Sequence, residues 1–207
     1  MKKTLSLLAL ISATFLPSAI HAGSIGDTYL QAGVGYARFD TGSDKLDMMT
    51  GRIEGNYALW NLGFMGIDLR ADYMYGGDTD SNLDAHLQQG RIEALAYANV
   101  LGILKPYVTA GGVYAESDYP TNTGNVDYSQ GGYSLSAGVQ IGVLPDLLYI
   151  TPSYRYTNAG SRDGNTYRLD ATLWITYIGV GAYVSYEDLQ HVNADLVEAG
   201  AYVSFRF

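Results

Sequence analysis

The sequence contains no cysteine and, beyond its start, no long hydrophobic run. A chain of 207 residues without cysteine is not a disulfide scaffold, so packing and hydrogen bonds must hold it together. No segment after residue 22 holds about 18 uninterrupted apolar residues, the length that a membrane-spanning helix needs. The chain therefore either stays soluble or crosses a membrane without helices.

Basic residues and proline are also scarce. The sequence has 12 Lys and Arg against 21 Asp and Glu, and this net charge of −9 argues against nucleic acid as a partner. With 5 Pro and a mean hydropathy of −0.02, the composition fits neither a disordered tail nor a helical membrane protein. Tyr and Gly are abundant instead, at 19 and 25 copies, as in the alternating strands of a membrane barrel.

The first residues have the organisation of a secretory signal peptide. Basic residues at Lys2 and Lys3 precede an apolar run from Leu5 to Leu16, and a small residue stands at Ala22. This pattern predicts a signal peptide over residues 1–22, removed after about Ala22. The remaining residues 23–207 are expected to form one domain.

The last segment alternates strictly between two kinds of residue. Its apolar positions are Val197, Ala199, Ala201, Val203, Phe205 and Phe207. A two-residue period predicts a strand, and the charged and polar residues between these positions predict lipid on one face and a polar lumen on the other.

The same period recurs along the chain. The other expected strands are 28–40, 45–60, 64–75, 86–100, 106–119, 133–143, 148–156, 167–177 and 180–186. We therefore predict an all-β fold, a closed antiparallel up-and-down transmembrane β-barrel of about ten strands, with eight as the alternative. Over residues 86–100 a helix is the alternative to a strand, because Ala, Leu and Glu favour helices. Gly111-Gly112 interrupt the alternation of the fifth strand, so which of its residues face outward is less clear. Pro152 lacks an N–H and predicts a local break in strand pairing.

The expected connections alternate between tight turns and longer polar loops, among them a loop over 120–129. Outer-membrane barrels place short turns in the periplasm and long loops outside. Aromatic residues gather near both kinds of strand end, as expected for two belts at the bilayer surfaces. Those near the turns are Trp60, Phe64, Tyr107, Tyr149, Tyr177 and Phe207, and those near the loops are Tyr36, Tyr75, Tyr119, Tyr133, Tyr156, Tyr167 and Tyr186.

With these features the mature chain resembles small single-chain bacterial outer-membrane barrels of the OmpA/OmpX-like superfamily. The resemblance implies a place in the outer membrane, contact with its lipid and lipopolysaccharide, and a final strand that the barrel-assembly machinery reads. The residues of that assembly signal would be Tyr202, Val203, Phe205 and Phe207. The run Tyr154-Arg155-Tyr156 with Asp163-Gly164-Asn165 bears a faint similarity to the YfaZ family.

The polar faces of the strands carry both signs of charge. The expected lumen residues are Arg52, Glu54, Asp68, Arg70, Asp72, Arg91, Glu93, Arg155, Arg168, Asp170, Glu198 and Arg206. Those on the second to fourth strands should form a cross-strand charge network, because opposite charges offset the cost of burying each other. A salt-bridged lumen plug is the favoured interpretation and a substrate or proton site the alternative, while Gly138, Gly142, Gly179 and Gly181 could leave a thin water path.

No motif predicts an enzyme, a cofactor or a metal centre. The loop 78–84 begins like a calcium loop but has Leu83 where that loop needs glycine. Acidic loops could still gather divalent cations that bridge lipopolysaccharide. The acidic residues expected at the rim are Asp40, Asp44, Asp47, Asp78, Asp80, Asp84, Glu116, Asp118, Asp127, Asp163 and Asp188. Apart from His21, the histidines are His86 and His191; His191 with Asp188 or Asp195 could imitate the Asp/His pair of barrel proteases.

Four functions remain from the sequence alone. The favoured one is an outer-membrane barrel with a structural, adhesion or lipid-interaction role. The others are a narrow channel for small solutes, a hydrolase at the rim, and a soluble barrel that binds an apolar ligand inside.

Overall fold

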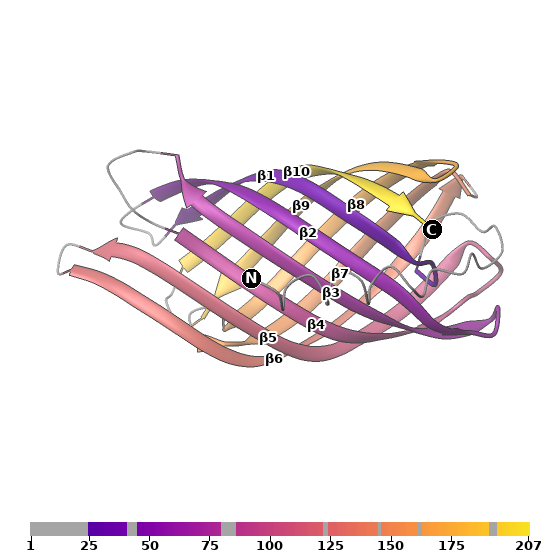
Figure 1. The fold of residues 1–207 in the computed structure, drawn as a ribbon, viewed down its shortest axis with the longest axis horizontal. Coiled ribbons are helices and arrows are strands. Elements are labelled where there is room, and N and C mark those ends of the chain that lie inside the picture. Colours follow the sequence, from indigo (N-terminus) through magenta and orange to yellow (C-terminus); the bar gives the residue numbers. More distant parts are fainter. Residues whose placement is uncertain are drawn as a thin grey trace, which may run out of the picture.

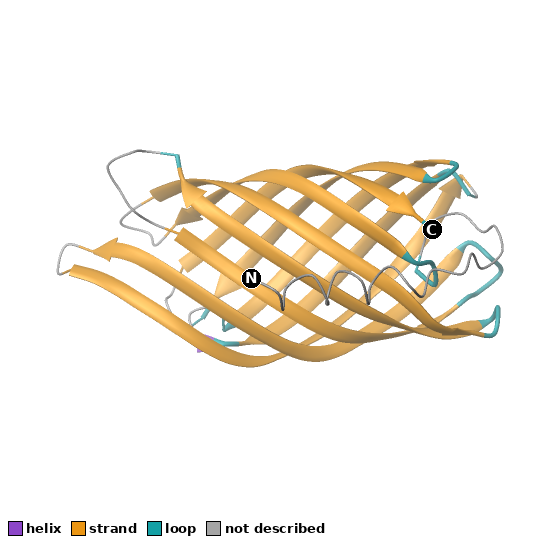
Figure 2. Cartoon of the chain, viewed as in Figure 1, coloured by secondary structure: helices purple, strands orange, loops and turns teal. Residues whose placement is uncertain are grey.

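The computed structural model describes residues 25–40, 45–79, 86–121, 124–144, 146–160, 163–190 and 194–207, without the side chains of 118–128. Ten antiparallel strands form one closed barrel (Figure 1), and strands make up almost all of its wall (Figure 2). The predicted fold and the count of ten are thereby confirmed. The strands are β1 (Tyr29–Asp40), β2 (Lys45–Asn61), β3 (Met65–Asp78), β4 (His86–Ala98), β5 (Leu104–Thr121), β6 (Gly124–Leu144), β7 (Leu148–Asn158), β8 (Gly164–Ile175), β9 (Ile178–Leu189) and β10 (Ala194–Arg206).

Each strand pairs with its neighbours in sequence, and β1 pairs with β10 to close the barrel. The closing register runs from Tyr29 opposite Arg206 to Asp40 opposite Asp195. Beyond it, the backbone N–H of Phe207 donates to the carbonyl of Thr28 at 3.1 Å. We call this end of the barrel, which also carries the four tight turns, the turn end, and the opposite end the loop end. Within the described part of the chain, no helix is long and apolar enough to cross a membrane.

The two faces of the wall differ as the sequence predicts. Val34, Ile92 and Ile175 point outward and are 64%, 63% and 64% exposed. Asp68, Glu93 and Glu198 point inward and are 0%, 1% and 3% exposed. A soluble barrel would bury its apolar face, because that burial drives its folding. The interpretation of the chain as a soluble ligand-binding barrel is therefore wrong.

The structure decides three local expectations: the helix alternative over 86–100, the loop over 120–129 and the reversal near Ile178. Residues 86–98 form strand β4 and not a helix, because they pair along their length with both β3 and β5. The expected loop over 120–129 is wrong: β5 and β6 stay paired up to Thr121 opposite Gly124. The reversal expected near Ile178 lies at residues 176–177, where Thr176 has a φ of 57°.

Pro152 interrupts the ladder between β6 and β7, as predicted. Gly138 pairs with Ser153 and Ile141 pairs with Ile150 in one register, but the two pairs between them are missing. Both missing pairs require an N–H at residue 152, which proline lacks. The strand itself continues, and Pro152 still pairs with Leu169 on its other side.

Candidate functional site: the lumen

The twelve predicted lumen residues all lie on the inward phase of their strands. Five arginines pair with five carboxylates inside the barrel. The pairs are Arg91 with Asp72, Arg168 with Asp170, Arg52 with Glu198, Arg155 with Glu93 and Arg70 with Glu54. Arg206, the sixth arginine, lies 3.9 Å from a carboxylate oxygen of Asp27 near the turn end.

Two of these pairs are tight. Arg91 donates three hydrogen bonds to Asp72, at 2.8 to 3.1 Å, and the two side chains are 5% and 2% exposed. Arg168 donates two to Asp170, at 2.7 and 2.8 Å, and stacks over the ring of Tyr183 at 4.0 Å. Two-pronged contacts of this kind are the strongest that arginine makes with a carboxylate.

In the other three pairs the charged atoms are farther apart, and two of these pairs join strands that are not neighbours in the sheet. Arg52 and Glu198 meet at 3.3 Å across β1, and Arg155 on β7 reaches Glu93 on β4 at 3.5 Å. Arg70 and Glu54 are separated by 3.7 Å. The predicted pairing between sheet neighbours is therefore only part of the arrangement, because arginine side chains also reach carboxylates two and three strands away.

Hydroxyl groups hold three of the carboxylates in place. Glu198 accepts hydrogen bonds from Thr50 and Tyr183, both at 2.7 Å. Glu93 accepts one from Ser134 at 2.6 Å. Glu54 accepts one from Tyr29 at 2.7 Å. These partners on β1, β2, β6 and β9 were missed from the sequence, as was the buried inward Glu187.

The residues before β1 fold into the turn end of the lumen. Ile25 is buried against Leu95, Tyr97 and Tyr107. Its N–H donates to Gln140 at 3.2 Å, and its carbonyl accepts from Lys105 at 2.8 Å. Next to it, the N–H of Gly26 donates to Asp68 at 2.9 Å, and Asn56 donates both to Asp68 and to the carbonyl of Asp27. No sequence pattern pointed to this segment.

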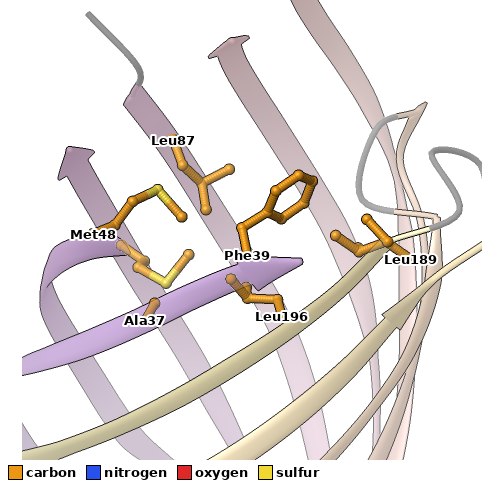
Figure 3. Close-up of a cluster of buried hydrophobic side chains, with 8 residues drawn as sticks. Ala37, Phe39, Met48, Leu87, Leu189 and Leu196 are labelled. Carbon is orange, nitrogen blue, oxygen red and sulfur yellow. The ribbon is translucent and has the colours of Figure 1, made fainter. Parts of the chain in front are cut away.

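The loop end of the lumen contains an apolar cluster. Eight buried side chains from β1, β2, β3, β4, β9 and β10 pack together there (Figure 3). They are Ala37, Phe39, Met48, Met74, Leu87, Leu189, Ala194 and Leu196. In the sequence these apolar residues stand at alternate positions that carry polar residues elsewhere along the strands, so the pattern alone indicates an apolar patch inside the barrel.

The expected water path along inward glycines is contradicted at three of its four positions. A Cβ added at Gly138, Gly179 or Gly181 would come within 3.0 Å of the ring of Tyr107, Trp174 or Tyr202. Aromatic side chains therefore occupy the space that these glycines leave. Tyr107 and Tyr149 themselves lie inside, 7% and 6% exposed, so their predicted place in the aromatic belt near the turns is wrong.

A cavity of about 100 Å³, which we call the central cavity, extends from Ile25, Gln140 and Trp174 near the turn end to the arginines in the middle of the lumen, and a smaller one of about 20 Å³ adjoins these arginines. Five guanidinium groups line the central cavity, those of Arg52, Arg70, Arg91, Arg155 and Arg168, but only two carboxylates, those of Glu54 and Asp170. Polar side chains such as Thr151, Ser153 and Gln140 form the rest of its wall with Tyr107, Trp174 and Tyr202. The cavity is thus rich in hydrogen-bond donors.

The rim residues are only partly described. Asp47 pairs with Arg38 at 2.7 Å and Asp40 with Lys45 at 3.2 Å, both in exposed positions. Of the suggested calcium loop over 78–84, Asp78 ends strand β3 and Thr79 donates to the carbonyl of Asp47, while residues 80–84 lie outside the described residues, as does His191. Asp188 and Asp195 face each other across β9 and β10, and Asp195 accepts a hydrogen bond from Tyr186. Among the described residues, no group of three or more His, Asp or Glu could hold a metal ion.

Comparison with protein families decides what kind of barrel this is. Residues 5–189 match the family described as outer membrane protein beta-barrel domain. The chain belongs to this family. It is a small barrel of the bacterial outer membrane, which confirms the resemblance to the OmpA/OmpX-like superfamily. The similarity to the YfaZ family stays a prediction, and comparison with curated proteins gave no match.

Solved structures of other outer-membrane barrels are similar to this chain at low sequence identity. An outer membrane channel from Pseudomonas putida F1 is 7% identical with a TM-score of 0.55, over 93% of this chain and 100% of that one. The beta domain of the Bordetella autotransporter Brka is 11% identical with a TM-score of 0.52, over 87% and 100%. The Yersinia pestis attachment invasion locus protein Ail is 12% identical with a TM-score of 0.48, over 88% and 99%. For the first two, whose TM-scores exceed 0.5, the likeness concerns the fold alone.

Proposed function

We propose that this protein is an outer-membrane barrel with a plugged lumen, and that it acts through its surfaces in a structural, adhesion or lipid-interaction role. The observation that carries the proposal is the filling of the lumen. Ion pairs cross its middle, Ile25 and its neighbours occupy the turn end, and the apolar cluster around Phe39 occupies the loop end. Barrels near this size are commonly filled by side chains.

Conductance in planar lipid bilayers tests the plug. We expect the purified protein to give no steps or only very small ones, because apolar constrictions and paired charges both oppose the entry of hydrated ions. A porin inserted in the same bilayers serves as the positive control. Large, stable steps whose size follows salt concentration would contradict a plugged lumen.

The loop end offers a surface on which a partner could be recognised. The hairpin of β5 and β6 continues beyond its neighbours: β4 pairs with β5 only as far as Asp118, and β7 pairs with β6 only from Tyr133. Figure 1 shows this hairpin projecting past the other strands. We propose that this end faces outward from the cell and the turn end faces the periplasm, as short turns do in related barrels.

Lipid contact is the second part of the proposed role. The outward faces carry the apolar residues that acyl chains would touch. At the loop end, successive register positions across five strands hold Tyr167, Tyr186, Val197, Arg38 and Asp47. Lipopolysaccharide and the divalent cations that bridge its phosphates are the proposed partners of the acidic rim. Calorimetry with calcium and magnesium on the detergent-solubilised protein tests the cation part, and an absence of binding heat would contradict it.

The exported form and its assembly are proposed from the sequence. We infer that residues 1–22 are removed as a signal peptide and that the final strand, with Tyr202, Val203, Phe205 and Phe207, is the assembly signal. In support, Val203, Phe205 and Phe207 face outward, whereas Tyr202 is buried in the lumen. Mass spectrometry of the protein from outer membranes tests the cleavage, since a mature chain beginning near Gly23 is expected.

A narrow channel is the second candidate, because the lumen retains the polar cavity of about 100 Å³. The same bilayer recordings separate it from the plugged barrel. An enzymatic role at the rim has the weakest support, since it depends on His191. Loss of peptide or lipid hydrolysis in His191→Ala would establish it, and we expect no such activity to be present.

A further inference from the structure

Inside the barrel, arginine donors outnumber the acceptors available to them. Each guanidinium carries five N–H donors and no acceptor. The Nε atoms of Arg52, Arg70 and Arg155 are buried and have no hydrogen-bond partner among the described residues. All three arginines line the central cavity and belong to the loosely held pairs, at 3.3, 3.7 and 3.5 Å from their carboxylates. Buried donors without partners are rare and call for a ligand or water.

The carboxylates are not placed to satisfy these donors. Glu93 and Glu198 accept hydroxyl hydrogen bonds from Ser134, Thr50 and Tyr183, and neither lines the central cavity. Asp72 is likewise absent from its lining and is fully engaged by Arg91. Five guanidinium groups therefore line the cavity, whereas the carboxylates of Asp72, Glu93 and Glu198 do not.

We propose that this central cavity is a binding site for a small inorganic oxyanion such as phosphate or sulfate. An oxyanion offers several acceptor oxygens at once, and arginine contacts such oxygens in two-pronged, charge-assisted geometry. The cavity of about 100 Å³ accommodates one such ion or several waters. The ion would connect Arg52, Arg70 and Arg155 and complete their hydrogen bonding.

Retention of labelled phosphate by the full mature chain tests the site. Because both ends of the lumen are filled, the protein is refolded in detergent with radiolabelled inorganic phosphate and then passed through gel filtration at constant ionic strength. We expect about one phosphate retained per barrel, and less when an excess of sulfate, but not of chloride, is present during refolding. Wild-type protein that retains no phosphate would overturn the proposal and leave water as the occupant.

Two variants assign the retained ion to the cavity. The double variant Arg155→Gln, Glu93→Gln removes a guanidinium together with its carboxylate, so the net charge is unchanged. We expect at least a tenfold rise in the phosphate dissociation constant, about 1.4 kcal/mol. The matched control, Arg38→Gln with Asp47→Asn, neutralises an exposed ion pair at the rim and should leave binding unchanged.

Thr151→Leu provides a second, independent variant, because it fills the cavity without altering any charge. It is used together with the double variant, and heat-modifiable gel migration shows which variants are folded. Undiminished phosphate retention in a folded Thr151→Leu or Arg155→Gln, Glu93→Gln barrel would refute the site. The result is separate from the conductance test, since a barrel that conducts can still be assayed for retained phosphate.

Discussion

The ion pair of Arg91 and Asp72 gives the sharpest test of how the lumen is stabilised. Asp72→Asn keeps the shape of the side chain but leaves a buried guanidinium without its counter-charge. Both side chains are at most 5% exposed and share three hydrogen bonds, so bulk solvent does not reach the guanidinium that loses its carboxylate. Removing one partner of a buried pair costs about 3–5 kcal/mol. With a urea dependence of about 2 kcal/mol per molar, the unfolding midpoint should fall by about 2 M.

The double variant Asp72→Leu, Arg91→Met separates the charge from the space it fills. Replacing a whole buried pair by apolar residues of similar volume is often neutral, so we expect stability within about 1 kcal/mol of the unmodified barrel. Urea titration in detergent, followed by Trp fluorescence and gel migration, measures both variants. Arg38→Gln is the exposed comparison and should shift the midpoint little, because solvent screens its pair with Asp47. Equal losses in the single and double variants would refute the reasoning.

Three further predictions concern the packing of the wall and the closure of the lumen. Gly138→Val would place its Cβ 2.6 Å from the ring of Tyr107 and should cost about 1–3 kcal/mol in urea titrations, whereas Gly112→Val, with nothing within 4 Å, should cost less than Gly138→Val. Pro152→Val restores an N–H facing β6 and should stabilise the barrel by about 0.5–1.5 kcal/mol. The amide of residue 152 should then be protected from hydrogen exchange, and rapid exchange would argue against a restored ladder. Deleting residues 23–27 should raise conductance in planar bilayers, and unchanged recordings would mean that this segment does not close the turn end.

The sequence predicts the wall of this barrel well because lipid imposes a simple rule. A residue that faces acyl chains must be apolar, and its neighbours along a strand then face the lumen, so the two-residue period carries both the strand and its phase. Residues 133–143 and 167–175 follow this rule almost without exception, and the structure places them accordingly. Even β4, rich in helix-forming Ala, Leu and Glu, is a strand, since pairing with two neighbours overrides local propensity.

The interior was predicted less well, because its contacts depend on the width of the lumen. Arg155 and Glu93 are far apart in sequence and belong to strands that are not neighbours, so no local pattern could pair them. Inward glycines were interpreted as open space, but space near Gly181 is taken by Tyr202 from the adjacent strand. Likewise, residues 124–129 lack alternation and looked like a loop, although pairing with β5 makes them a strand.

The arrangement of the interior follows from the same constraint that shapes the wall. Because the outer face must be apolar, nearly all charge within the membrane has to lie inside, where it must be paired or hydrogen-bonded to be tolerated. Apolar groups then gather where the lumen meets water, around Phe39 at one end and Ile25 at the other, and limit the access of solvent to the ion pairs. The pairs gain strength from this exclusion, since charges interact more strongly away from bulk water. The two apolar ends and the charged middle therefore depend on each other. Removing apolar side chains at either end should admit water to the ion pairs between them and reduce the stability that these pairs contribute.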